Sequence, residues 1–358
     1  MEKFSNTMRY NIVKVLSALV LFMICTKVMA QKSGFAFVEK KDQRQLDLMF
    51  NDKLVTAYCY FDSSRKPVLF PVNTIDGITV TRSYPFKLIP GERTDHPHHT
   101  GIWLNYESVN GLDFWNNSTA IAPEKRDHYG TISHQKIVSK QSSGNKASLT
   151  TTAIWVRPDN KVLLDENTTF HFTADVSKNS LIIDRITTLT AKDIDVIFKD
   201  VKDGMFAIRV ARELELPSKE KSNFVDDKGN VTTVPPSTGS DASGMYYSSN
   251  GAQGDSVWST KGEWVMLTGK KDGKDISIGM FDHPSNVGYP TYWHARGYGL
   301  FALNPLGRKV FSNGKEELNY TLKPGQSVTF RYRIVVHSGK FLTSDDMNKL
   351  AGDFKNSK

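Results

Sequence analysis

Alternation of apolar and polar residues with a period of two is the feature that most constrains how this chain can fold. Successive side chains of a β-strand point to opposite faces of a sheet, so this pattern is typical of half-buried strands. The alternating segments are rich in Val, Ile, Thr, Phe and Tyr and are bounded by turn-forming residues. They span residues 44–50, 54–61, 77–84, 146–156, 180–191, 207–216, 263–271, 275–282 and 327–338.

Helical periodicity is nearly absent from the sequence. The segment 344–354 predicts one α-helix, with Thr343 or Ser344 as its N-cap and two aspartates in its first turn. Asp-Gly-Lys at 272–274 predicts a hairpin turn between two strands. Many short strands with one terminal helix predict an all-β fold, a large antiparallel β-sandwich with a short C-terminal helix.

The first 30 residues predict a secretory signal peptide. Basic residues precede a short apolar run over 15–24, and Val28 and Ala30 occupy the −3 and −1 positions of a cleavage site. We expect cleavage after Ala30 and a periplasmic or secreted protein. Residues 31–358 are then expected to form a single sandwich domain, with the polar stretch near 217–243 as a surface insertion.

Composition and missing motifs exclude several classes of protein. The net charge of +8 is spread along the 358 residues and forms no basic stripe, which argues against a nucleic-acid partner. The sequence after residue 30 has no apolar stretch long enough to span a membrane. It also lacks the GxSxG elbow, HExxH, a P-loop, CxxC and a dinucleotide-binding glycine motif, which argues against serine hydrolases, zinc proteases and nucleotide enzymes. Cys59 has no partner cysteine in the mature chain and is expected to be buried.

Three histidines in four positions stand out at DHPHHTGIWL, residues 95–104. Pro97 disfavours helix for His96, so the segment is expected to be extended. His96 and His98 would then share one face and His99 would take the other. An H-x-H pair can present two imidazoles to a substrate or to a divalent metal ion. The alternative is a polar turn whose imidazoles bind loop backbone.

Other stretches add polar and aromatic residues between the strands. HPSNVGYPTYWHARGYGLFALNPLG, 283–307, is one, GLDFWNNS, 111–118, is another, and GMFAIRVARELEL, 204–216, is the third. Loops that carry aromatics and cations are where sandwich folds place binding sites, although buried aromatics and an exposed ion pair explain the same residues. We expect the histidine segment and the stretch around Trp293, His294 and Arg296 to line one concave site, because distant strands of a sandwich become neighbours.

The motifs DHPHHTGIWL, GLDFW, GMFAIRVA and HPSNVGYPTYWHARGYGLFALNPLG together resemble the secreted bacterial family labelled methane oxygenase PmoA, a domain of unknown function. A multispanning membrane oxygenase is nevertheless excluded by the β pattern of this chain. The layout around LVTAYCYFDSSRKPVLFPV is also similar to galactose-mutarotase-like sandwiches. That resemblance implies a supersandwich that binds sugars on a concave face, with histidine and a carboxylate as acid and base.

The leading hypothesis is an exported carbohydrate-active enzyme, an epimerase, lyase or hydrolase with histidine acid/base chemistry. Its predicted catalytic residues are His96, His98, His99 and His294. Its predicted substrate-binding residues are Trp103, Asp113, Trp115, Arg209, Glu213, His283, Tyr292, Trp293 and Arg296. The alternatives are a non-catalytic glycan-binding sandwich and a metalloprotein with a divalent metal at His96 and His98.

Overall fold

The computed structural model describes residues 33–234 and 242–357. The predicted signal peptide therefore lies outside the described residues. From Ser33 onward the chain forms one compact unit. None of the helices in the described ranges has the length and hydrophobicity of a membrane-spanning segment.

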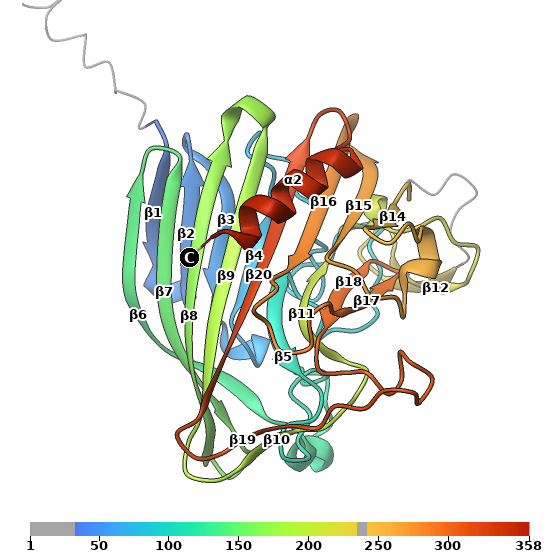
Figure 1. Cartoon of the computed structure of the whole chain (residues 1–358). Coiled ribbons are helices and arrows are strands. Elements are labelled where there is room, and N and C mark those ends of the chain that lie inside the picture. Colours follow the sequence, from blue (N-terminus) through green and yellow to red (C-terminus); the bar gives the residue numbers. More distant parts are fainter. Residues whose placement is uncertain (1–32, 235–241, 358) are drawn as a thin grey trace, which may run out of the picture. The chain divides into compact units, whose positions relative to one another are not determined.

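Two antiparallel sheets of eight strands form the described part of the chain (Figure 1). The first sheet has the order β1 (Phe35–Lys40), β2 (Gln45–Phe50), β3 (Lys53–Cys59), β4 (Val68–Val72), β5 (Ile102–Tyr106), β11 (Gly204–Arg209), β18 (Leu300–Asn304) and β17 (Tyr292–Arg296). The second has the order β14 (Met245–Ser248), β15 (Trp264–Lys271), β16 (Lys274–Asp282), β20 (Ser327–Ser338), β9 (Ser180–Ala191), β8 (Val162–Asp175), β7 (Lys146–Val156) and β6 (Thr131–Ser143).

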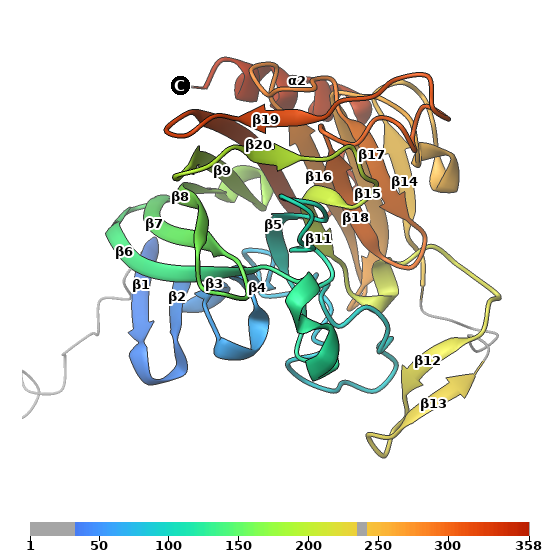
Figure 2. The same ribbon diagram turned by 90° about the horizontal axis from the view of Figure 1, so that it is seen from below.

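The remaining elements are short. Two small hairpins pair β10 (Val196–Phe198) with β19 (Tyr320–Leu322) and β12 (Ser222–Val225) with β13 (Val231–Val234). The short 3-10 helices are η1 (Lys41–Gln43), η2 (Asp62–Ser64), η3 (Pro123–His128), η4 (Val176–Lys178), η5 (Arg212–Leu214) and η6 (Gly254–Val257). The β12–β13 hairpin falls within the predicted polar insertion and extends away from both sheets (Figure 2).

Alternation along each strand decides which side chains fill the space between the sheets. In β5, Ile102, Leu104 and Tyr106 belong to the main core, whereas Trp103 belongs to a separate cluster on the outer face of the first sheet. Buried Cys59 lies in that same outer cluster. The outer face of the first sheet therefore carries its own partly aromatic layer, and this layer supports the site described below.

The α-helix α2 (Ser344–Lys355) covers the outer face of the second sheet (Figure 1). Thr343 is its N-cap, and its side chain accepts a hydrogen bond from the Asp346 backbone amide. Met347 and Phe354 pack against Trp264 and other apolar residues of β15, β16 and β20. The predicted all-β sandwich with a short C-terminal helix is confirmed.

Two predicted strands differ from the structure. Residues 77–84 form only isolated bridges, such as Thr81 with Val210, because this segment follows a turn in which the Gly77 amide donates to the Thr74 carbonyl. The segment 207–216 leaves the sheet after Arg209, and η5 follows because the Leu214 amide donates to the Ala211 carbonyl.

Candidate active site

The three histidines lie in a turn immediately before β5. The His99 amide donates to the His96 carbonyl at 3.0 Å, and His96 has a φ of +43°. The predicted extended course is therefore wrong, because Pro97 occupies a turn and not a strand. The turn brings all three rings together: the ring of His99 lies 4.8 Å from that of His96 and 4.3 Å from that of His98. We call residues 95–99 the histidine turn.

Arg82 fixes the backbone of the histidine turn. Its buried guanidinium donates to the carbonyls of Asp95 at 2.8 Å, His96 at 2.9 Å and His99 at 3.1 Å. Gly101 ends the segment with a φ of +56°, and a Cβ there would lie only 2.1 Å from the Leu69 carbonyl oxygen. The course of the histidine turn is thus set by a buried cation on one side and by a residue without a side chain on the other.

A buried charge network lies behind the histidine turn. One oxygen of Asp95 accepts from Arg82 at 2.6 Å and from Arg209 at 2.7 Å, and the other lies 3.1 Å from His96 Nδ1. Burial raises the pKa of Asp95, but the hydrogen bond from His96 and the charges of Arg209 and Arg82 outweigh it and hold that pKa well below its usual range. Asp95 is therefore an anion that orients the His96 ring.

Arg209 was predicted to contact substrate, and the structure buries it completely. Besides Asp95, its guanidinium lies 3.3 Å from His99 Nδ1 and over the ring of Tyr298 at 4.9 Å. A second carboxylate, Glu215, pairs with Arg93 and Arg212 at 2.6 Å each. Arg209 consequently acts as a positioning residue between Asp95, His99 and Tyr298.

Two buried aromatic rings pack against His99 of the histidine turn. His99 stacks on Trp103 at 5.3 Å, and Trp115 meets the edge of His99 at 5.9 Å. Both tryptophans are at most 1% exposed. Burial, reinforced by neighbouring cationic groups, lowers the pKa of His98 and His99 well below its ordinary value. These two imidazoles are therefore neutral and packed.

A buried lysine and an aspartate flank the histidine turn on the β4 side. Lys66 donates to the His98 carbonyl at 2.7 Å and lies over the Trp103 ring at 5.4 Å. Burial lowers the pKa of Lys66 to about 7, opposed by the charge of Asp113. Asp113 accepts from the Asn116 amide at 2.9 Å, and burial raises its pKa. Lys66 and Asp113 are thus two groups with perturbed pKa values at the edge of the site.

The β17–β18 hairpin flanks the opposite side of the histidine turn. The ring of Tyr298 stacks on that of His96 at 4.9 Å. His294 lies in register with Ala302, which pairs with Ala207, which in turn pairs with Trp103. The outer face of the first sheet therefore carries one row of side chains across β17, β18, β11 and β5. Its members are His294, Ala302, Ala207 and Trp103.

His294 is 3% exposed, and its Nδ1 lies 3.4 Å from Asp203 Oδ1 without a hydrogen bond. Burial and the nearby charges of Lys202, Arg296 and His96 lower the pKa of His294 to about 3. Burial raises the pKa of Asp203, an effect that Lys202 opposes and Asp113 strengthens. This end of the row thus holds a neutral imidazole beside a carboxyl group that binds its proton more tightly than usual.

The predicted convergence holds for part of the second stretch. Arg296 lies 6.0 Å from the Tyr298 ring, on the same face as His294. Trp293 points the opposite way, into the core, where its indole donates to the Gly262 carbonyl at 3.1 Å. Tyr292 shares the face of His294, but its hydroxyl donates to Glu316 at 2.9 Å.

Two other predicted residues lie elsewhere. The ring of His283 packs against Phe354 of α2 at 5.0 Å and bonds Ser285 at 2.7 Å. Glu213 pairs with Lys271 of β15, in the second sheet. Neither side chain contacts the histidine turn, because the strand alternation expected over 207–216 ends at Arg209 and because His283 follows a strand of the second sheet.

Sequence reasoning missed Asp95, Asp203, Lys66 and Tyr298. Asp95 and Tyr298 stand inside the two stretches that were singled out, so their neighbourhood was a usable signal. Asp203 stands in an ordinary polar segment, and Lys66 stands in the segment whose layout is similar to galactose-mutarotase-like sandwiches. The position of both residues at the site depends on strand pairing that spacing does not reveal.

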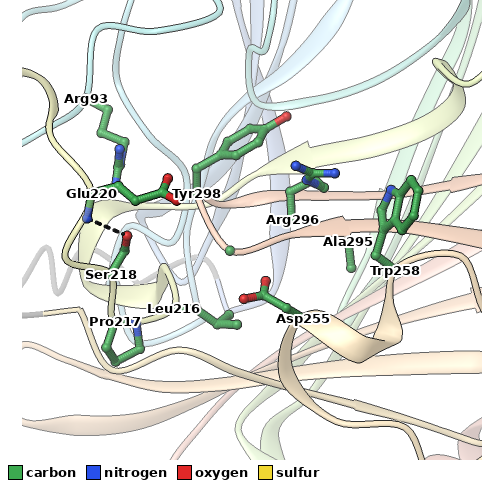
Figure 3. Close-up of a pocket in the computed structure, with 11 residues that line it drawn as sticks. Arg93, Leu216, Pro217, Ser218, Glu220, Asp255, Trp258, Ala295, Arg296 and Tyr298 are labelled. Carbon is green, nitrogen blue, oxygen red and sulfur yellow. Dashed lines mark hydrogen bonds between the residues drawn. The ribbon is translucent and has the colours of Figure 1, made fainter.

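A pocket of about 340 Å³ (Figure 3) adjoins the site at Tyr298, which lines the pocket and stacks on His96. Its walls come from the segment just before the histidine turn, the beginning of the polar insertion, η6 and the β17–β18 hairpin. The lining residues are Arg93, Leu216, Pro217, Ser218, Glu220, Asp255, Trp258, Ala295, Arg296, Gly297 and Tyr298.

Within residues 33–234 and 242–357, no three His, Cys, Asp or Glu side chains are grouped so that they could hold a metal ion, so the H-x-H metal hypothesis lacks a ligand set there.

A family model described as "Family of unknown function (DUF6807)" matches residues 45–352. No curated protein matches the sequence. The methane oxygenase resemblance stays a prediction, since the matching model carries a different description.

Solved structures with some similarity are distant. The galactosidase domain of an alpha-galactosidase-sucrose kinase is 10% identical, with a TM-score of 0.41 over 85% of this chain and 42% of that chain, so this chain spans less than half of it. Galactose 1-epimerase from Lactobacillus acidophilus NCFM is 9% identical, with a TM-score of 0.35 over 87% of this chain and 100% of that chain. A galactose mutarotase-like protein from Lactobacillus casei ATCC 334 is 10% identical, with a TM-score of 0.30 over 85% of this chain and 100% of that chain.

Proposed function

Because the chain belongs to the DUF6807 family, whose function is unknown, we propose its activity from the histidine turn itself. We propose an enzyme that binds a saccharide on the outer face of the first sheet and moves protons to and from it. His96 is the base in this proposal and Asp203 is the acid.

The proposal rests on two properties of His96: its side chain is accessible to solvent, and it lies beside the carboxylate of Asp95. The His96 side chain is 41% exposed, while the rings of His98 and His99 beside it are buried. Asp95 Oδ2 lies 3.1 Å from His96 Nδ1, and Asp95 is itself held by two buried arginines. An exposed imidazole whose Nδ1 lies beside a fixed carboxylate is oriented for general-base work.

Asp203 supplies a matched acid on the opposite side. A carboxyl group whose pKa is raised by burial keeps its proton at a higher pH than an exposed carboxyl group. It sits beside neutral His294, which adds no positive charge that would favour its ionisation.

A hydroxyl-rich ligand matches the polar atoms on this face. Trp103 Nε1, Asn105 Oδ1 and His294 Nδ1 are buried and have no hydrogen-bond partner among the described residues. Buried polar atoms are almost always paired, with protein, ordered water or ligand. The aromatic ring of Tyr298 beside them offers a flat face for a sugar ring, and neutral donors and acceptors suit hydroxyl groups.

The test compares wild-type protein with His96→Gln and Asp203→Asn. Each is incubated with neutral mono-, di- and trisaccharides, and the products are followed by chromatography and by NMR of the anomeric and ring protons. We expect a product from wild-type protein and a loss of about a hundredfold or more in rate for each variant, the usual contribution of a positioned acid or base. His128→Gln, at an exposed position of η3, is the matched control.

Two results would overturn the proposal. Binding without any product would assign the protein to the non-catalytic glycan-binding class. Equal rates for wild type and both variants would place the chemistry elsewhere.

We also propose export after cleavage behind Ala30, which N-terminal sequencing of the mature protein tests: a chain that begins at Met1 contradicts it.

A further inference from the structure

The pocket shown in Figure 3 is separate from the histidine turn, and the acid/base chemistry above does not use it. We infer that this pocket is a second saccharide subsite, so that the substrate is a neutral oligosaccharide or glycoside and not a free monosaccharide. This inference rests on the proposed function and specifies its substrate class.

The position of the pocket supports a continuous ligand. Tyr298 lines the pocket and also stacks on His96 at 4.9 Å. Arg93 lines it too, and its backbone bridges Phe224 just before the histidine turn. A bound saccharide could therefore place one sugar unit at His96 and the next in the pocket, with only Tyr298 between the two positions. A volume of about 340 Å³ is at the lower end of the range for small-ligand pockets.

The pocket holds polar groups that the protein leaves unused. The Arg296 side chain forms no ion pair or hydrogen bond within the described ranges, and it lies 5.6 Å from the Trp258 ring centroid and 6.0 Å from that of Tyr298. Trp258 Nε1 is a buried donor without a partner among the described residues. Figure 3 shows the carboxylates of Asp255 and Glu220 directed toward the middle of the pocket. These groups can donate to and accept from hydroxyl groups.

The charges in the pocket favour a neutral ligand. The charged side chains that line the pocket are two arginines, Arg93 and Arg296, and two carboxylates, Asp255 and Glu220, so the charges of its walls balance. Balanced walls offer an anionic sugar no net attraction, whereas hydroxyl groups can bind to both signs of charge. The absence of a side chain at Gly297 leaves room for Asp255, because a Cβ at residue 297 would lie 3.1 Å from Asp255 Oδ1. Aromatic rings beside acidic and basic side chains are suited to a ring with hydroxyl groups.

The experiment measures binding by calorimetry with a matched set of probes. The probes are glucose, galactose, maltose, cellobiose, lactose, maltotriose, cellotriose, galacturonic acid and digalacturonic acid. The proteins are wild type, Arg296→Gln, Trp258→Phe and the control Arg126→Gln, an exposed arginine of η3. Thermal unfolding of each variant shows that the fold is kept.

We expect at least one neutral di- or trisaccharide to bind about tenfold more tightly than its monosaccharide, the effect of one added hydrogen bond to a charged group. Arg296→Gln and Trp258→Phe should each remove most of that advantage, and Trp258→Phe should leave monosaccharide binding unchanged. Arg126→Gln should behave as wild type.

Each other outcome has a distinct meaning. Equal affinity for monosaccharides and longer chains, or an advantage that survives both variants, overturns the second subsite and leaves the acid/base proposal intact. A preference for digalacturonic acid overturns the neutral class. Absence of binding to every probe counts against both the subsite and the saccharide function.

Discussion

Replacing His294 with Asn should flatten the loss of stability that the protein suffers in acid. The ring is 3% exposed and has no hydrogen bond at Nδ1 among the described residues. Burial, together with the nearby charges of Lys202, Arg296 and His96, lowers the pKa of His294 from 6.5 to about 3. The folded protein therefore keeps this imidazole neutral where the unfolded chain would protonate it.

The sign and size of the effect follow from proton linkage. Below pH 6.5 the unfolded chain binds a proton at His294 that the folded protein does not bind, so the free energy of unfolding falls as the pH falls toward 3. One pKa unit corresponds to about 1.4 kcal/mol. Between about pH 6.5 and 4.5, His294 alone should thus remove on the order of 2–3 kcal/mol. His98 and His99 add to the total loss in wild type, but they are common to both proteins.

Urea unfolding, followed by tryptophan fluorescence at about pH 7 and pH 4.5, measures this difference. The drop in unfolding free energy between the two pH values should be smaller in His294→Asn than in wild type by on the order of 2–3 kcal/mol. His128→Asn, at an exposed histidine, should show the wild-type drop. Equal drops in all three proteins would refute the reasoning, because they would mean that His294 is protonated in the folded state.

Further substitutions test the supports of the site and the fold. Arg82→Met should cost about 3–5 kcal/mol in urea unfolding, since it leaves Asp95 with one fewer buried partner and frees three carbonyls of the histidine turn; a cost below about 1 kcal/mol would contradict this. Gly101→Ala should destabilise by more than about 2 kcal/mol, because its Cβ would collide with the Leu69 carbonyl, whereas Gly111→Ala, with open space around it, should cost less. Thr343→Ala should cost about 1 kcal/mol through the lost N-cap of α2, and unchanged thermal unfolding would argue against the cap.

Period-two alternation was sufficient to predict most of the long strands. It identified β7, β9, β15, β16 and β20 because each has one face in the core and the other turned outward. The cap and acidic first turn of α2 were visible as well. Residues 77–84 alternate in the same way but form single bridges, since alternation reports one buried face and does not report whether a partner strand runs alongside.

The candidate site was predictable only in part. The clustering of histidines marked the histidine turn, and parity along β17 places His294 on the outer face while it sends adjacent Trp293 into the core. Spacing alone could not choose between these neighbours, because it does not tell which face of a strand is the core face. Asp203 stayed invisible for a related reason: its partner His294 is brought near it only by the pairing of β18 with β11 and β17.

The placement of α2 gives the sandwich two unlike outer faces. The apolar side chains of the helix cover the second sheet, whereas the histidine turn lies on the first sheet, across the full thickness of the core. A linker attached behind the end of α2 would therefore leave the histidine side open to solvent. Anchoring the protein to a sensor surface through that end orients it for measurements with large, insoluble or branched polymers, whereas random coupling through lysines would mask a fraction of the molecules.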